Sequence, residues 1–373
     1  MSKNKTRPPL GRRCLFALAC LLAIPPVLLF ITTPMDAGHQ ALLGAASVLL
    51  MALVNRVRPD SRRVSLWLVA LSLIVSSRYI WWRATATLHF ESVPEAVLGY
   101  GLFLAELYAL VILLLGYLQT LWPLERKLVP LPDDTAQWPT VDVYIPTYNE
   151  SLEVVTDTIL SAQNLDYPAD KIRIYMLDDG RRESFEAFAK SAGVGYITRA
   201  NNQHAKAGNL NNALGQTDGE LICVFDCDHI PTAGFLQATV GGFLDDAKLA
   251  MVQTPHYFYS QDPFERNLGV GEELPREGEL FYGPVQKGND FWNAPFFCGS
   301  CAVIRREALD ETDGFAVETV TEDAHTALRF QRKGWRTAFV SLPLAAIAID
   351  RAATVTLSGT STIATTSDSP NEQ

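Results

Sequence analysis

The sequence predicts an α/β domain built on a mainly parallel sheet, preceded by an N-terminal membrane region of four transmembrane helices. Three observations support this prediction. Hydrophobic residues make up 48% of the 373-residue chain and are concentrated in its first third. From residue 140 onward, short apolar runs alternate with amphipathic stretches, which is typical of parallel sheets covered by helices. Acidic and polar residues directly follow several of these runs, where sheets of this kind bind ligands.

Four apolar stretches in the first third have about the length that crosses a bilayer. They cover residues 14–31, 40–54, 64–82 and 96–122, and the second is short for a full span. Arginine and lysine residues lie before the first stretch, between the second and third, and after the fourth, whereas the other two loops hold only Arg83. This asymmetry predicts that the N-terminus and the α/β domain are cytoplasmic. Glu106, inside the fourth stretch, is expected to pair within the helix bundle.

The remaining chain divides by composition. A proline-rich linker covers residues 129–139, the α/β domain covers 140–350, and a tail rich in Ser and Thr covers 351–373. The tail has no core-forming pattern and is expected to be disordered. The membrane region is therefore assigned to residues 1–128. A net charge of −10 argues against nucleic acid as a partner, because phosphate backbones are bound mainly by basic residues.

Polar residues are expected to follow several strands of the α/β domain. Predicted strands cover 141–145, 172–177, 193–198 and 221–225, and predicted helices cover 153–165 and 204–214. The fourth strand ends in Asp226 and Asp228, which point to the same side of an extended chain and can together bind one hard cation. Asp178 and Asp179 follow the second strand, and residues 147–150 follow the first. A solvated acidic turn explains one such cluster, but three at one sheet edge indicate a binding site.

The six cysteines do not suggest a disulfide framework, because the expected cytoplasmic side keeps thiols reduced. The alternative is a zinc site, since thiolates in this number are common zinc ligands. Its candidate ligands are Cys223, Cys227, Cys298 and Cys301.

Six short motifs carry a resemblance to a known family. They read PTYNE at 146–150, LDDG at 177–180, HAKAGNLN at 204–211, DCDH at 226–229, FFCGS at 296–300 and TED at 321–323. In this order and spacing, after four membrane helices, they resemble the processive family 2 glycosyltransferases, and most closely the catalytic subunits of bacterial cellulose synthase. The resemblance implies a GT-A (Rossmann-like) glycosyltransferase domain in a multi-pass protein of the bacterial inner membrane.

The resemblance also implies a reaction and its residues. Glucose would pass from UDP-glucose to the 4-hydroxyl of a growing β-1,4-glucan with inversion, and a Mg²⁺ ion, with Mn²⁺ as the alternative, would stabilise the departing UDP. The implied metal ligands are Asp226 and Asp228. The implied nucleotide-sugar contacts are Tyr148, Glu150, Asp178, Asp179, Lys206 and Asp226, and the implied acceptor contacts are Phe297, Cys298, Gly299, Ser300 and Glu322. The implied catalytic residues are Asp323, as general base, and Asp179.

Asp323 is expected at the start of a helix. Thr319 and Glu322 fit a capping box, which puts Asp323 in the first turn, where the helix dipole favours a carboxylate. The alternative is that Glu322 and Asp323 only cap this helix. The segment 331–335 is expected to end it, with Gly334 as the C-terminal cap.

The sequence also departs from the family. The Q-x-x-R-W motif, the later channel helices and the cyclic di-GMP-binding PilZ domain do not follow TED. We therefore expect a truncated synthase that does not bind cyclic di-GMP and makes no polymer alone, although the family implies a periplasmic partner subunit. Two classes stay open: a cellulose-synthase-type enzyme, and an inactive remnant that only binds UDP. Within the first class, hyaluronan, chitin or a β-1,3-glucan is the alternative product.

Overall fold

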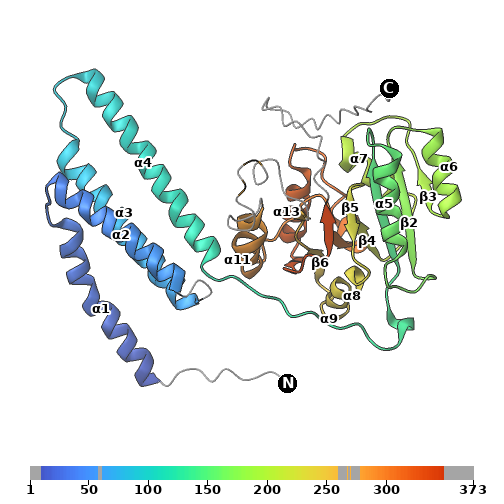
Figure 1. Cartoon of the computed structure of the whole chain (residues 1–373), viewed down its shortest axis with the longest axis horizontal. Helices are drawn as coiled ribbons and strands as arrows, with labels where there is room; N and C mark the ends of the chain where they lie inside the picture. Colours follow the sequence, from blue (N-terminus) through green and yellow to red (C-terminus); the bar gives the residue numbers. More distant parts are fainter. Residues whose placement is uncertain (1–9, 58–60, 259–266, 268, 270–277, 348–373) are drawn as a thin grey trace. The chain divides into compact units, whose positions relative to one another are not determined.

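The computed structural model describes residues 10–57, 61–258, 267, 269 and 278–347. The chain divides into two compact units between Leu121 and Trp122, and Figure 1 shows the elements of each. The predicted tail at 351–373 lies outside the described residues. Its disorder, and the domain bounds inferred from composition, therefore stay predictions.

The N-terminal unit consists of long apolar helices. They are α1 (Leu10–Thr32), α2 (Ala37–Val57), α3 (Arg62–Trp82) with a π-helical extension (Arg83–Thr87), and α4 (Val93–Thr120). Three helical stretches in the described residues are long and apolar enough to cross a membrane, namely Ala37–Val57, Arg62–Thr87 and Val93–Thr120. In α1 the apolar stretch is shorter, Leu21–Thr32. Three of the four predicted membrane spans thus correspond to helices of sufficient length and hydropathy, and the predicted first span, in α1, is not confirmed.

Three charged side chains in this unit, Arg78, Arg83 and Glu106, have polar partners. Arg83 Nε donates to Glu106 Oε2 at 2.7 Å, and the Tyr79 hydroxyl donates to Glu106 Oε1 at 2.9 Å. The prediction that Glu106 pairs within the bundle is therefore confirmed. Arg78 is buried and donates to the Thr33 carbonyl at 2.8 Å, where α1 has just ended. A cation at that position neutralises the carbonyl end of the helix.

The second unit is organised around a seven-stranded sheet. Its strands are β1 (Val141–Thr147), β2 (Ile172–Asp178), β3 (Gly195–Ile197), β4 (Leu221–Val224), β6 (Leu249–Gln253), β8 (Ala302–Arg305) and β9 (Arg336–Phe339). Their order is β3-β2-β1-β4-β8-β6-β9, and only β8 runs antiparallel to its neighbours. A smaller sheet has the order β5-β10-β7, from β5 (His229–Pro231), β10 (Ala345–Ile347) and β7 (Tyr257–Phe258). The predicted mainly parallel sheet is confirmed.

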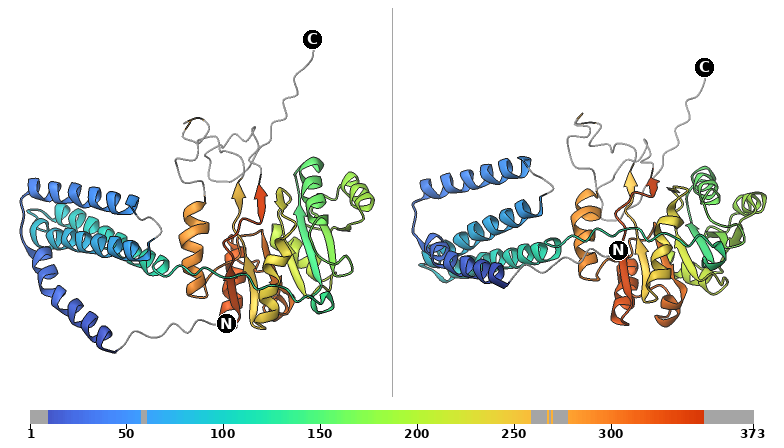
Figure 2. Two further views of the ribbon diagram at one scale, coloured as in Figure 1. Left: turned by 60° about the horizontal axis from the view of Figure 1, so that its bottom comes forward. Right: turned by 90° about the horizontal axis from the view of Figure 1, so that it is seen from below.

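Helices cover both faces of the large sheet. They are α5 (Leu152–Gln163), α6 (Glu183–Ala192), α7 (Ala205–Leu214), α8 (Phe235–Thr239), α9 (Gly241–Asp245), α11 (Gln286–Phe291), α12 (Arg306–Glu311) and α13 (Glu322–Arg332), with short turns at Thr135–Gln137 and Phe281–Val285. Figure 2 gives two further views of them, with α11 in orange. The α13 helix ends as predicted, because Gly334 adopts a φ of 86° and the Trp335 amide donates to the Phe330 carbonyl at 3.0 Å, the bonding of a Schellman cap.

The central strand β1 explains why the sequence folds this way. All seven of its residues are buried. Val141, Val143 and Ile145 join the hydrophobic cluster that includes α5, whereas Tyr144 joins the cluster that includes α7. A strand buried on both faces requires a nearly continuous apolar run, and this is the pattern seen at 141–145.

The predicted linker at 129–139 is fixed against the second unit. The Trp138 indole donates to the Pro132 carbonyl at 2.8 Å, and its ring lies 5.1 Å from that of Tyr167. The Tyr167 hydroxyl in turn donates to the Pro139 carbonyl at 2.6 Å. The proline-rich segment is thus part of the folded surface rather than a free tether.

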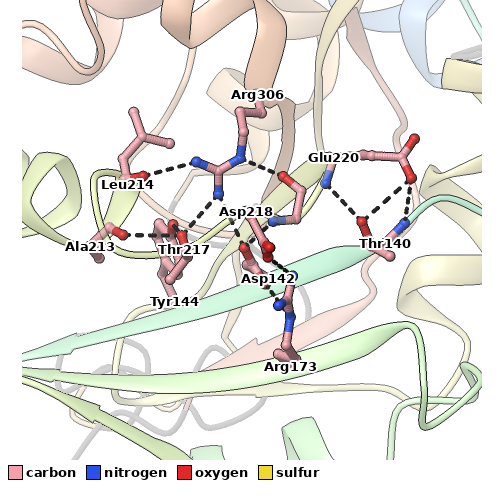
Figure 3. Close-up of polar contacts among 11 residues, drawn as sticks. Thr140, Asp142, Tyr144, Arg173, Ala213, Leu214, Thr217, Asp218, Glu220 and Arg306 are labelled. Atoms are coloured by element: carbon pink, nitrogen blue, oxygen red, sulfur yellow. Dashed lines mark hydrogen bonds and ion pairs between the residues drawn. The ribbon is translucent and has the colours of Figure 1, made fainter.

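The amino edge of the sheet carries a polar network centred on Asp142 and Arg306 (Figure 3). Arg306 Nη2 donates to Asp142 Oδ2 at 3.1 Å, and its other nitrogens donate to the Leu214 and Gly219 carbonyls at 2.9 and 2.5 Å. Arg173 of β2 lies 3.1 Å from Asp142 Oδ1. These charge-assisted contacts join β1, β2, α12 and the loop before β4.

Candidate functional site

The candidate site lies at the carboxyl edge of the large sheet. Strands β1, β2 and β4 are parallel, so the residues that follow them meet at one edge. Strand β8 runs the opposite way and pairs Ala302 with Val224, so it begins at that edge. The Ser300 hydroxyl consequently accepts a hydrogen bond from the Asp226 amide at 2.8 Å. The FFCGS and DCDH motifs, far apart in sequence, are therefore adjacent.

The loop after β1 presents an aromatic ring to solvent. Glu150 Oε2 accepts hydrogen bonds from the Tyr148 amide at 2.8 Å and from the Thr147 hydroxyl at 2.9 Å. These bonds fold the loop back on itself and leave Tyr148 54% exposed. An exposed tyrosine held in this way offers a flat apolar face with a polar tip.

Asp178 lies inside the protein. It is completely buried, and its carboxylate accepts hydrogen bonds from Arg182, from the Gly180 amide at 2.9 Å and from the Tyr196 hydroxyl at 2.9 Å. Burial acts to raise the pKa of Asp178, but the bonds from Arg182 outweigh it and the pKa lies below its ordinary value. Its carboxylate thus stays ionised and holds the turn after β2.

Asp179 is clamped by an arginine that the sequence analysis did not single out. Arg199 Nε and Nη2 donate to the two Asp179 oxygens at 2.7 and 2.6 Å, a bidentate pair. Arg199 also donates to the Gln203 and Ala205 carbonyls at 2.6 and 2.7 Å. This one side chain therefore ties the end of β2 to the start of α7. The only sequence signal was a cation in the segment before HAKAGNLN.

Lys206 lies in the first turn of α7 and points to the same edge. Its Nζ pairs with Asp226 Oδ1 and donates to the Gly299 carbonyl at 2.8 Å. Burial acts to lower the pKa of Lys206, but Asp226 and Asp323 outweigh it and raise that pKa. The ammonium group is thus charged and joins three of the predicted motifs.

Asp226, Asp228 and His229 form a group that can hold a divalent metal ion, because one ligand atom from each lies within 4.8 Å of the others. Asp228 Oδ1 lies 2.8 Å from His229 Nδ1, and the Asp228 side chain is 48% exposed. Burial acts to lower the pKa of His229, but Asp228 and Cys301 raise it to about 10. Two carboxylates at a strand end fit a hard cation well.

Asp323 lies in the first turn of α13, as predicted. The capping box is wrong, however. The helix begins at Glu322 with Thr321 as its N-cap, and no side chain caps it. The helix thus starts two residues later than a capping box at Thr319 requires, and the preceding segment is bound to it by the Ala316 amide, which donates to the Thr326 hydroxyl at 2.8 Å.

The approach of Asp323 to the FFCGS loop depends on a glycine. Gly299 adopts a φ of 86°, and a Cβ at this position would lie 2.8 Å from Asp323 Oδ2 and 3.2 Å from Lys206 Nζ. Burial raises the pKa of Asp323 to about 6; Lys206 opposes this rise, and Glu322 and Asp226 add to it. The result is a carboxylate of raised basicity beside a lysine and the candidate metal ligands.

The other predicted acceptor residues differ in exposure. Phe297 is completely buried, with its ring centroid 6.0 Å from that of Phe315, and Ser300 is also buried. Cys298 and Glu322 are partly exposed. Phe297 and Ser300 thus hold the loop in place, and any contact of theirs with an acceptor stays a prediction.

The alternative zinc site built from four cysteines is not formed. Cys223, Cys227, Cys298 and Cys301 are free thiols. Among the groups of metal-ligating side chains in the described residues, only Cys301 takes part, together with His229 and His256. Cys223 lies inside β4, and Cys227, Cys298 and Cys301 lie in loops, and the described residues contain no ligand set built from several cysteines.

Comparison with known proteins agrees with this geometry. Residues 142–313 match the model of the glycosyl transferase family 2. The chain is 55% identical over 340 residues to the cellulose synthase catalytic subunit (UDP-forming) of Xanthomonas axonopodis pv. citri (strain 306), covering 91% of this chain and 46% of that protein. It is 54% identical over 308 residues to the cellulose synthase 1 catalytic subunit (UDP-forming) of Komagataeibacter xylinus, covering 83% of this chain and 41% of that protein. The chain thus spans less than half the length of these relatives.

A solved structure shares the fold. It is a mannosyltransferase from Pyrobaculum calidifontis in complex with GDP-Man and Mn²⁺, with a TM-score of 0.50 and 21% sequence identity. The match covers 64% of this chain and 65% of that one. At this identity the likeness supports the GT-A-type α/β fold, and the predicted fold class is confirmed.

Proposed function

Because this chain belongs to the family of bacterial cellulose synthase catalytic subunits and carries a family 2 glycosyl transferase domain, we propose that it binds UDP-glucose and directs glucose to the 4-hydroxyl of a β-1,4-glucan. One observation supports this proposal most directly. At the carboxyl edge of the sheet, Lys206 contacts both Asp226 and the Gly299 carbonyl, and Asp323 lies beside Gly299. A cation, a candidate metal ligand and a basic carboxylate are the groups that this transfer requires.

The donor is proposed to lie along the ends of β1, β2 and β4. The exposed ring of Tyr148 suits stacking on a base, and Glu150 keeps that ring turned outward. Asp179 has its carboxylate bound by Arg199, so we propose that it positions the donor loop. Asp178 has a similar role through Arg182. Lys206 suits contact with the diphosphate, as a compact cation at a helix start.

Asp226 and Asp228 would hold the divalent ion, and we propose Mg²⁺ because hard cations favour carboxylate oxygens. When bound, such an ion stabilises the negative charge that develops on the departing diphosphate. Lys206 adds a second positive charge on the same side. Its contact with Asp226 keeps the ammonium group directed at this point without substrate.

Asp323 is proposed as the general base. It would accept the proton of the acceptor hydroxyl as that oxygen attacks the anomeric carbon and the bond to UDP breaks on the opposite face, which inverts the configuration. A base works best when its pKa is near the working pH, and burial raises the pKa of Asp323 to about 6. Gly299 lies beside this carboxylate, and Cys298 and Glu322 are partly exposed. All three are proposed acceptor contacts, supported by Phe297 and Ser300.

The chain is also proposed to be a multi-pass protein of the bacterial inner membrane with a cytoplasmic catalytic unit. The support is the three apolar helices and the arginine and lysine residues near their ends. Its partners would then be the lipid bilayer, the glucan and a periplasmic subunit.

The proposal is tested by UDP binding to detergent-purified chain, measured by titration calorimetry with and without Mg²⁺. A chelator and the Asp228→Ala variant should each weaken binding by at least about tenfold if the ion links carboxylate and diphosphate. Asp310→Ala is the matched control, because Asp310 is an exposed carboxylate of α12, beyond the amino edge. Equal affinity with and without metal would contradict the metal role. Competition among UDP-sugars then tests glucose, since a stronger preference for UDP-N-acetylglucosamine would favour chitin or hyaluronan.

A further inference from the structure

A second group of metal-ligating side chains lies beside the carboxylate pair and has no part in the proposed reaction. It consists of His229 in β5, His256 just before β7, and Cys301 just before β8, and one ligand atom from each lies within 4.8 Å of the others. The His229 and His256 ring centroids are 4.8 Å apart at an interplanar angle of 78°. The small sheet and the start of β8 thus bring three soft or borderline donors together.

The hydrogen bonds of the two imidazoles leave one ring nitrogen of each for a metal. Asp228 Oδ1 lies 2.8 Å from His229 Nδ1, and a carboxylate there keeps a proton on Nδ1, so a metal would bind at Nε2 and displace the proton there. His229 Nε2 is buried and has no hydrogen-bond partner among the described residues. His256 Nε2 lies 3.2 Å from the Ser300 carbonyl, which can only accept. Outer contacts of this kind orient the histidines of metal sites.

Cys301 is held equally firmly. Its φ is 55°, and its carbonyl accepts hydrogen bonds from the Thr254 amide and hydroxyl, each at 3.0 Å. Gln253 is buried and bridges the loop, since its amide nitrogen donates to the Ser300 carbonyl at 2.7 Å and its oxygen accepts from the Cys298 amide at 2.9 Å. The thiol therefore belongs to a rigid frame shared with the two imidazoles.

We propose that His229, His256 and Cys301 form a second metal site, which binds a zinc-class ion and is distinct from the hard-cation site at Asp226 and Asp228. Imidazole and thiolate donors select zinc over magnesium. Zinc bonds are about 2.0 Å to nitrogen and about 2.3 Å to sulfur, so the three ligand atoms need to close by only about an ångström. Three protein ligands leave the fourth position to water. Binding releases the protons of the thiol and of any protonated imidazole.

Such an ion would affect the donor site through His229, and this consequence rests on the proposed function. The imidazole that binds zinc through Nε2 also contacts Asp228 through Nδ1. Zinc would move the ring and, with it, a carboxylate proposed to hold the donor's metal. Zinc is therefore expected to weaken UDP binding without competing directly for the diphosphate.

The test uses the whole chain in detergent, freed of metal and titrated with Zn²⁺ against a chromophoric chelator in excess Mg²⁺. One Zn²⁺ should bind despite the Mg²⁺, and Co²⁺ at the same site should give a thiolate-to-metal charge-transfer band. His256→Gln and Cys301→Ser should each weaken Zn²⁺ binding by at least about tenfold and remove that band. Cys298→Ser, the matched thiol, and Asp226→Asn should keep both. Because Cys301 is buried, His256→Gln at a partly exposed position is the variant expected to fold normally, as checked by its unfolding midpoint.

Two results would overturn the site: a Zn²⁺ affinity unchanged in His256→Gln, or Zn²⁺ binding lost in Asp226→Asn but kept in Cys301→Ser. Calorimetry with UDP separates this inference from the proposed function. If UDP fails to bind without Zn²⁺, the proposed function is wrong. If UDP binds normally and Zn²⁺ does not weaken it in the wild type, the coupling through His229 is wrong.

Discussion

Replacing Gly299 with alanine should disable the site while leaving the fold nearly intact. Gly299 and Gly334 both adopt a φ of 86°, so alanine is strained equally at either position. At Gly334 a Cβ would meet nothing within 4 Å, whereas at Gly299 it would lie 2.8 Å from Asp323 Oδ2 and 3.2 Å from Lys206 Nζ. The pair thus separates backbone strain from displacement of the site residues.

The expected losses of stability and activity follow from the backbone strain and from the displacement of the site residues. A left-handed backbone costs a residue with a Cβ about 1–2 kcal/mol, and the less flexible unfolded chain recovers about 0.4–1 kcal/mol. Gly334→Ala should therefore lower the free energy of unfolding by about 1 kcal/mol with activity unchanged. Gly299→Ala should have a similar effect on stability. It must also shift the Asp323 carboxylate, and a displacement of about 1 Å at a reacting group can reduce the rate about 100-fold.

The assay is UDP release from UDP-glucose by purified chain, with urea unfolding followed by tryptophan fluorescence on the same samples. Gly299→Ala should lose nearly all UDP release at an unfolding midpoint close to that of Gly334→Ala. If Gly299→Ala releases UDP as fast as Gly334→Ala does, the closeness of Asp323 and Lys206 to this backbone is irrelevant to the chemistry. If the two variants differ strongly in stability, the loss reports unfolding instead.

Three further predictions concern charge. In Asp323→Asn, UDP release should be lost, but the free energy of unfolding should rise. Burial raises the pKa of Asp323 from 3.8 to about 6, so above that pKa the charged carboxylate destabilises the folded state. The variant should therefore gain stability there, by no more than about 3 kcal/mol. The gain should vanish when unfolding is measured below pH 3.8, and a gain independent of pH would contradict this. Arg199→Gln should lower unfolding free energy by about 3–5 kcal/mol, because it strands the buried Asp179 carboxylate. Arg199→Lys should restore only part of the lost unfolding free energy, since lysine lacks the planar guanidinium group that binds both carboxylate oxygens. Full restoration of the stability would show that charge alone matters. A reporter fused after Pro132 should be active only as a cytoplasmic reporter, and periplasmic activity would refute the assigned orientation.

The sequence predicted best what depends on local pattern. The run at 221–225 is apolar and short, so a buried strand ending in two carboxylates was foreseeable, and the structure has β4 at Leu221–Val224. The parallel order of the first strands followed from their alternation with helices. Asp323 was placed in the first turn of α13 correctly, although through a capping box that does not form.

What the sequence did not predict depends on contacts between distant segments. Arg199 finds Asp179 only because β2 and α7 meet at the sheet edge. His256 gave no signal, because its neighbours His229 and Cys301 are distant in sequence, in β5 and just before β8. The burial of Phe297 likewise depends on Phe315, which comes from a different segment. Spacing along the chain carries no information on such pairs, and the motif resemblance names residues without their partners.

The reversed strand β8 has a consequence for how this site can change over time. Because β8 begins at the edge where β4 ends, the site is assembled from two separate blocks of the chain. The first block, from β1 to Asp228, holds the groups proposed to face the donor, and the second, from Gln253 to Asp323, holds those proposed to face the acceptor. The two blocks are joined firmly away from the site, by the pairing of β4 with β8 and by the bonds of Arg306 to Asp142, whereas at the site they meet through Lys206 with Gly299 and Ser300 with the Asp226 amide. Selection can therefore alter the receiving sugar in one block while the nucleotide machinery in the other is inherited unchanged.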